Sequence, residues 1–165
     1  MWFWFFEARN DRSTAPLVMW LNGGPGCSSM TGLFQENGPC TFNNVSGTTP
    51  VLNPYSWNTY ANMLYIDQPI GSGFSYGNEN TNSTPEAAPV IWNFMQAFYA
   101  HFTEYENSDF ALSTESYGGH YGPKFASYLW AWLFRLYPSN PLKPASVSPK
   151  TLALTRVLFL ALKFR

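Results

Sequence analysis

Apolar runs and helical stretches alternate along most of the chain. Runs rich in aromatic and aliphatic residues predict β-strands at residues 2–6, 17–21, 62–66 and 110–113. The Asn10-Asp11 turn signal between the first two runs favours a hairpin. Helices are predicted at residues 28–34, 83–102 and 119–133. Because strands and helices alternate, the sequence predicts an α/β fold with a parallel sheet covered by helices.

The helix that begins near residue 83 has the clearest signature. Ser83 lies three residues before Glu86, and Pro85 falls in the first turn. A hydroxyl and a carboxylate at this spacing cap a helix start, where proline is also tolerated. Apolar side chains then recur at helical spacing, at Ile91, Phe94, Phe98 and Phe102. The pattern predicts a capped amphipathic helix.

Composition narrows the class of protein. Of the 165 residues, 45% are hydrophobic, 19% aromatic and 12% charged. These values are typical of one packed domain and argue against a disordered or nucleic-acid-binding segment. No run approaches the length of about 18 apolar residues that a membrane span requires. The apolar start, residues 1–6, is too short for a signal peptide core.

Charge is divided unevenly along the chain. Residues 1–132 carry three basic residues and all ten acidic ones, whereas residues 133–165 carry six basic residues and no acidic one. We therefore interpret residues 133–165 as a basic tail unrelated to the domain at 1–132, as translation of an intron or of a shifted reading frame would produce. The alternative is a basic extension that contacts a membrane surface or an acidic partner.

A serine lies between the last predicted strand and the last predicted helix, in the sequence Thr114-Glu115-Ser116-Tyr117-Gly118. A nucleophile elbow places a serine on such a turn with the pattern Gly-x-Ser-x-Gly. Gly118 fits the second glycine, and Thr114 replaces the first. Ser116 is therefore a candidate nucleophile, and a purely structural turn is the alternative.

A glycine-rich loop at residues 22–26 (NGGPG) follows the strand predicted at 17–21. Acyl transfer builds negative charge on the former carbonyl oxygen, and fixed backbone N–H donors stabilise that charge. We expect the amides of Gly24 and Tyr117 to be these donors. Taken alone, the loop also fits a plain turn.

Three sequence blocks together resemble the serine carboxypeptidases, and their residues are most similar to those of the fungal members. They are WLNGGPGCSS at residues 20–29, DQPIGSGFSY at 67–76 and ESYGGHY at 115–121. The resemblance covers roughly residues 2–130, about the N-terminal third of a full-length member. It implies an incomplete α/β-hydrolase fold and the removal of C-terminal residues from peptides and proteins. It implies no cofactor, and no metal-ligand spacing is present.

By position, Ser116 matches the family nucleophile, and the amides of Gly24 and Tyr117 match the oxyanion donors. In the family the triad follows the order Ser, Asp, His, and the last two members lie far downstream. We therefore expect this chain to lack both. His120 is expected to be a packed helix residue, and His101 is expected to end the preceding helix.

The resemblance also implies a site for the terminal carboxylate of a substrate. Asn22 and Glu115 match the pair that hydrogen-bonds this carboxylate, and Trp20 belongs to the same network. A glutamate can donate to a carboxylate only when it is protonated. Binding is therefore expected to be best in acid, which suits a vacuolar or secreted protein.

The cysteines and glycosylation signals fit a protein of the secretory route. Cys27 and Cys40 are expected to be unpaired thiols here, with a bridge between them as the alternative, because family cysteines pair mostly with downstream partners. Asn44 and Asn82 begin acceptor sequences for N-glycans.

Two other functions stay open at this stage. The first is a non-catalytic module that binds peptide C-termini through Asn22 and Glu115 without cleaving them. The second is an esterase on the same fold, because one fold supports several acyl-transfer reactions.

Overall fold

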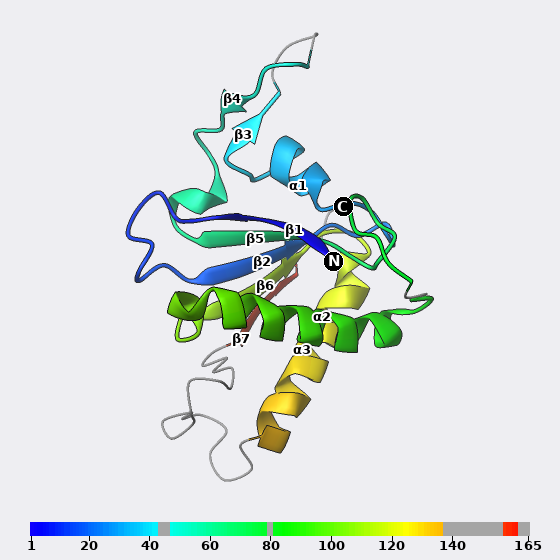
Figure 1. Ribbon diagram of the computed structural model, residues 1–165. Coiled ribbons are helices and arrows are strands. Elements are labelled where there is room, and N and C mark those ends of the chain that lie inside the picture. The colour runs from blue at the N-terminus through cyan, green and yellow to red at the C-terminus, as the bar shows by residue number, and fades with distance from the viewer. Residues whose placement is uncertain (43–46, 79–80, 137–156, 162–165) are drawn as a thin grey trace.

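The computed structural model describes residues 1–42, 47–78, 81–136 and 157–161 (Figure 1). The strands are β1 (Trp2–Phe6), β2 (Leu17–Leu21), β3 (Cys40–Thr41), β4 (Val51–Leu52), β5 (Asn62–Asp67), β6 (Phe110–Thr114) and β7 (Val157–Ala161). The helices are α1 (Met30–Gln35), α2 (Thr84–His101) and α3 (Gly118–Leu136), with 3₁₀ turns at Trp57–Thr59 and Thr103–Tyr105. The predicted α/β class is confirmed.

The main sheet has the strand order β1-β5-β2-β6-β7, and β3 and β4 form a small separate pair. β5, β2, β6 and β7 run parallel to one another, and β1 runs antiparallel to β5. The carboxyl ends of β2, β5 and β6 therefore meet at one edge of the sheet. Ligand sites of open α/β sheets lie at this edge.

The predicted hairpin between β1 and β2 is wrong. β5 lies between these two strands, and β1 pairs with β5 along its whole length, from Trp2 opposite Asp67 to Phe6 opposite Met63. A local turn does form at Asp11, where the side-chain Oδ1 accepts a hydrogen bond of 3.1 Å from the Ser13 amide. A turn signal indicates a change of direction, and the insertion of the buried strand β5 between β1 and β2 decides which strands pair.

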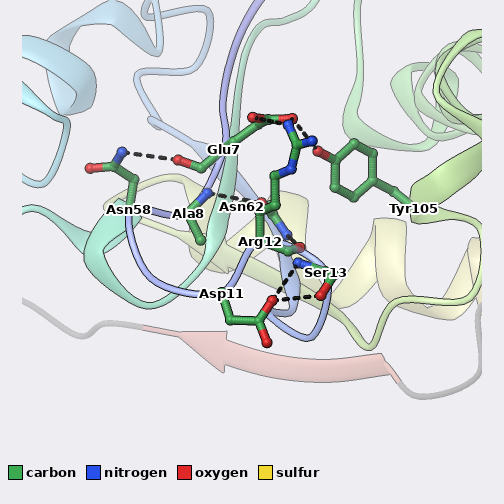
Figure 2. Close-up of polar contacts among 8 residues, drawn as sticks. All are labelled: Glu7, Ala8, Asp11, Arg12, Ser13, Asn58, Asn62 and Tyr105. Atoms are coloured by element: carbon green, nitrogen blue, oxygen red, sulfur yellow. Dashed lines mark hydrogen bonds and ion pairs between the residues drawn. The ribbon is translucent and has the colours of Figure 1, made fainter.

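Side chains from the first residue of β5 and from the 3₁₀ turn before it hold the connection between β1 and β2 (Figure 2). Asn62 Oδ1 accepts a hydrogen bond of 2.9 Å from the Ala8 amide, and Asn62 Nδ2 donates one of 3.0 Å to the Arg12 carbonyl. Asn58 Nδ2 donates a bond of 3.1 Å to the Glu7 carbonyl. These contacts satisfy backbone groups that a two-stranded hairpin would have paired within itself.

Helices cover both faces of the sheet (Figure 1). α2 and α3 pack on one face, and α1 packs on the other. Successive side chains of β2 and β5 point alternately to these two faces. Met19 and Leu64 lie in the core under α2 and α3, whereas Trp20 and Tyr65 lie in the core under α1. In the described part of the chain, no helix is both long enough and apolar enough to cross a membrane.

The helix predicted from the capping signature is confirmed as α2. Ser83 Oγ accepts a hydrogen bond of 3.4 Å from the Glu86 amide, which is the expected cap. The Glu86 carboxylate accepts a bond of 2.8 Å from the Asn82 amide, one residue before the capping serine. Pro85 lies in the first turn, as predicted.

The helix predicted at residues 119–133 is confirmed as α3, but its last residues and the strand β7 were not predicted. α3 continues past residue 132 to Leu136, and β7 pairs in parallel with β6, Phe110 opposite Val157. Residues 137–156 and 162–165 lie outside the described residues. The interpretation of residues 133–165 as an unrelated tail stays a prediction.

Candidate active site

Ser116 occupies a tight turn between β6 and α3. Its φ is +57°, a left-handed conformation that side chains larger than glycine adopt at a cost. The turn is closed by a hydrogen bond of 2.8 Å from the Gly118 amide to the Glu115 carbonyl. The Ser116 side chain is exposed to solvent. This strand–turn–helix arrangement is that of a nucleophile elbow.

Thr114 occupies the position of the first glycine in the usual elbow pattern, and its side chain is accommodated next to Gly118. Its hydroxyl is buried and donates a hydrogen bond of 2.9 Å to the Gly118 carbonyl. A Cβ at Gly118 would lie 2.5 Å from Thr114 Cβ, so only glycine fits at position 118 while threonine occupies position 114. The threonine thus closes the turn with its own side chain.

The loop of residues 22–26 lies against this turn. A Cβ at Gly23 would collide with the backbone nitrogen of Tyr117 and would lie 2.7 Å from the Glu115 carbonyl oxygen. Gly24 has a φ of +103°, which favours glycine. Among the described residues, neither the Gly24 nor the Tyr117 backbone N–H donates to another group. The structure therefore brings the two expected donors and Ser116 into one region.

Asn22 is hydrogen-bonded to both Trp20 and Glu115. The buried Asn22 side chain accepts hydrogen bonds of 2.9 Å at Oδ1 from Trp20 Nε1 and from the Gly32 amide. These two donors fix the orientation of the side-chain amide. Its Nδ2 then points to Glu115 Oε2 at 3.4 Å.

Glu36 belongs to the same network, and the sequence reasoning missed it. Asn22 Nδ2 donates a hydrogen bond of 2.9 Å to Glu36 Oε1, which is shorter than its bond to Glu115. Glu36 follows α1 directly, and its amide donates to the Gly32 carbonyl. The short helix predicted after the glycine loop was the available signal, because it carries the next residues back beside Asn22.

Asp67 joins the two glycine-containing loops at this edge of the sheet. Its fully buried carboxylate accepts hydrogen bonds of 2.7 Å from Ser28 Oγ, 2.8 Å from the Ser29 amide and 2.9 Å from the Phe74 amide. With both oxygens engaged by loop groups, Asp67 acts as a structural acceptor. The loops that begin at residues 22 and 67 are thereby held together.

The two histidines lie apart from one another on the helices. The ring centroids of His120 and Tyr117 are 4.6 Å apart, but His120 is exposed, so the prediction of a packed residue is wrong. Gly119 and His120 both lie on the side of α3 that faces solvent. His101 ends α2 as predicted, and its Nδ1 lies 2.9 Å from the Ala97 carbonyl.

Other predicted positions lie outside this network. Cys27 and Cys40 are free thiols, as expected. Asn82 is exposed just before α2, whereas Asn44 lies outside the described residues. Over the described ranges, no group of three or more His, Cys, Asp or Glu side chains is placed to hold a metal ion.

A serine elbow at the carboxyl edge of a mostly parallel sheet, with helices on both faces, defines a partial α/β-hydrolase fold. The sequence pattern that describes the serine carboxypeptidases matches residues 1–131. The chain belongs to the serine carboxypeptidase family.

Comparison with individual proteins agrees with this family assignment. The chain is 69% identical over 129 residues to carboxypeptidase S1 of Penicillium janthinellum, which covers 78% of this chain and 30% of that protein. It is 49% identical over 124 residues to carboxypeptidase Y of Komagataella phaffii, covering 75% and 23%. The crystal structure of the prohormone-processing carboxypeptidase Kex1Δp of Saccharomyces cerevisiae matches with a TM-score of 0.76 at 30% identity, covering 95% of this chain and 33% of that one. The chain thus spans about a third or less of these relatives.

Proposed function

We propose that a full-length protein carrying this chain is a serine carboxypeptidase, which releases C-terminal residues from peptides and proteins through an acyl-enzyme at acidic pH. One observation carries the proposal: Glu115, which faces the Asn22 amide, is the direct neighbour of Ser116 on the strained turn. A group that binds a terminal carboxylate beside the nucleophile selects the last peptide bond of a substrate. Membership in the family supports the same reading.

In this proposal Ser116 Oγ adds to the carbonyl carbon of the last peptide bond, and its proton passes to a general base. The amides of Gly24 and Tyr117 donate to the oxyanion that forms. Collapse of this intermediate expels the amine of the last residue, which takes up the proton, and leaves an ester on Ser116. Water then hydrolyses the ester and regenerates the serine.

The substrate carboxylate is held by Asn22 and Glu115, with Glu36 as a third member. Asn22 donates through Nδ2, and Trp20 keeps this amide in the donating orientation. Each glutamate hydrogen-bonds the carboxylate as the neutral acid, because two charged carboxylates repel each other. This requirement makes binding strongest in acid, in a vacuole or an acidic extracellular medium.

In this proposal the general base is a histidine, oriented by an aspartate. Both belong to the full-length protein and follow residue 131, where the match to the family ends. The order Ser, Asp, His is that of α/β-hydrolases. The exposed sequon at Asn82 fits glycosylation on the secretory route that such a compartment requires.

The experiment is a release assay with an N-blocked dipeptide acid at acidic and neutral pH, on the full-length protein. We expect Ser116→Ala to abolish release and Ser127→Ala, at an exposed serine on α3, to leave it unchanged. Undiminished release by Ser116→Ala would show that the nucleophile is assigned wrongly.

A second candidate function is a non-catalytic module that binds peptide C-termini. It is favoured because hydrogen bonds link Trp20, Asn22, Glu36 and Glu115 to one another, and binding through these side chains does not require Ser116 to react. Calorimetry on the 165-residue chain with a peptide acid and its amide tests this candidate. Preference for the acid at low pH without turnover supports it, and equal binding of acid and amide contradicts it.

A further inference from the structure

The hydroxyl of Tyr121 contacts the glycine loop from the helix that carries the nucleophile. Tyr121 ends the first turn of α3, and its hydroxyl accepts a hydrogen bond of 3.0 Å from the Gly26 amide. The two residues are 95 positions apart in the sequence. Tyr121 is only 3% exposed, whereas Gly26 lies at the surface, so the bond joins a buried side chain to an exposed loop.

The ring of Tyr121 has little freedom to move. It stacks on the fully buried ring of Phe125, with centroids 5.5 Å apart and planes inclined by 14°. The Tyr117 ring contacts it edge-on at 5.2 Å. The hydroxyl is therefore a fixed acceptor on a rigid helix.

The middle of the loop that Tyr121 contacts, at Gly24–Gly26, has few other restraints. Gly24 and Gly26 have φ values of +103° and +80°, and glycine reaches many other conformations at similar energy. One local bond, of 3.1 Å from the Cys27 amide to the Gly23 carbonyl, closes the turn internally. Bonds to Ser29 and Asp67 hold the two ends of the loop, and the Gly26 bond to Tyr121 ties its middle to α3.

We propose that Tyr121 is a positioning residue for the oxyanion site, which holds the Gly24 donor in register with the Tyr117 donor through Gly26. Tyr117 and Tyr121 are four residues apart, so they lie on the same side of the helix start. One helix start thereby carries the nucleophile, one donor amide and the anchor of the loop that supplies the other donor. Donors that are fixed before reaction stabilise an oxyanion best. The inference rests on the proposed function.

The hydrogen bond between Tyr121 and Gly26 is expected to be unaffected by pH in the acidic range. Burial raises the pKa of the Tyr121 phenol above its ordinary value, so the hydroxyl is neutral and able to accept at every working pH. Near the hydroxyl lie the buried Gln68 side chain and the thiol of Cys27. The Tyr117 ring contacts the Tyr121 ring from the turn just before this helix. Loss of the hydroxyl is therefore expected to lower the rate equally at all pH values.

The test is Tyr121→Phe in the full-length protein, with Tyr105→Phe as the matched control. Tyr105 is equally buried, and its hydroxyl makes one hydrogen bond of 2.9 Å to Glu7, at the opposite edge of the sheet (Figure 2). We expect kcat to fall about tenfold in Tyr121→Phe, a part of the loss caused by deleting an oxyanion donor. KM and the shape of the pH profile are expected to stay unchanged, and Tyr105→Phe is expected to keep the wild-type kcat.

A second readout requires no activity. Hydrogen exchange of the Gly26 amide, followed by NMR on the 165-residue chain, is expected to be faster in Tyr121→Phe and unchanged in Tyr105→Phe. An unchanged kcat in Tyr121→Phe, or equal losses of kcat in both variants, would overturn the inference. Wild-type protein that releases no residue would instead overturn the proposed function, and the inference with it.

Discussion

Asn22 Nδ2 donates to Glu36 Oε1 at 2.9 Å, within 3.4 Å of a second carboxylate oxygen, that of Glu115. Two carboxyl groups from distant parts of the chain thus share one amide donor. Asn22 is buried and its orientation is fixed by Trp20 and Gly32. The two N–H donors of this amide point toward the two glutamates, where a ligand carboxylate would meet them.

Glu36→Ala is expected to weaken substrate binding in the full-length protein. Because Glu36 is proposed to bind the substrate carboxylate, its loss removes one hydrogen bond to a charged group and raises KM about tenfold. kcat is expected to change little, since the bond exists before and during reaction. Glu104→Ala, at an exposed glutamate on the far edge, is the control. Equal KM values for wild type and Glu36→Ala would remove Glu36 from the site.

Gly23→Ala is expected to disrupt the active site and destabilise the domain. The added Cβ meets backbone atoms of Tyr117 and Glu115, which cannot rotate away as a side chain could. Gly119→Ala is the matched control, because open space surrounds its Cβ position in α3. Thermal unfolding followed by circular dichroism is expected to show a lower Tm for Gly23→Ala and an unchanged or higher Tm for Gly119→Ala. A wild-type Tm for Gly23→Ala would contradict the close packing of loop and elbow.

Thr114→Val tests how the elbow tolerates a residue larger than glycine. Valine keeps the shape but removes the donor to the buried Gly118 carbonyl. Because the Gly118 carbonyl also accepts the helix bond from residue 122, the variant loses one hydrogen bond, which costs about 0.5–1.5 kcal/mol of unfolding free energy. Urea titration of the chain measures this loss, and Thr114→Ser, which retains the hydroxyl, is expected to lose less. Equal stability of Thr114→Val and wild type would show that this bond does not hold the turn.

The Glu7 cluster predicts a dependence of stability on pH. Hydrogen bonds from Arg12 first, and from Tyr105 second, hold the pKa of the Glu7 carboxyl below its ordinary value. A lowered pKa contributes stability above the unfolded-state value, and this contribution disappears as pH falls through the folded-state value. The effect is small because Glu7 is exposed at the surface. Urea titrations are expected to show Glu7→Gln slightly less stable than wild type at neutral pH and equal to it in strong acid. A constant difference at both pH values would assign the effect to packing.

Local features were predicted correctly because neighbouring residues decide them. The cap of α2 depends on Ser83 and Glu86, three positions apart, and the elbow depends on the residues that flank Ser116. The exposed His120 was predicted to be packed, because its helix was known but the side that the helix buries was not.

The sequence by itself determined the strand–turn–helix elements, the glycine loops and the family to which their motifs point, since each is encoded in a short run of residues. Only the tertiary structure decided that β5 separates β1 from β2, that Glu36 joins Asn22, and that Tyr121 meets Gly26. These contacts link residues far apart in the chain, and their free energy comes from burial and hydrogen bonding that exist only after the sheet has assembled.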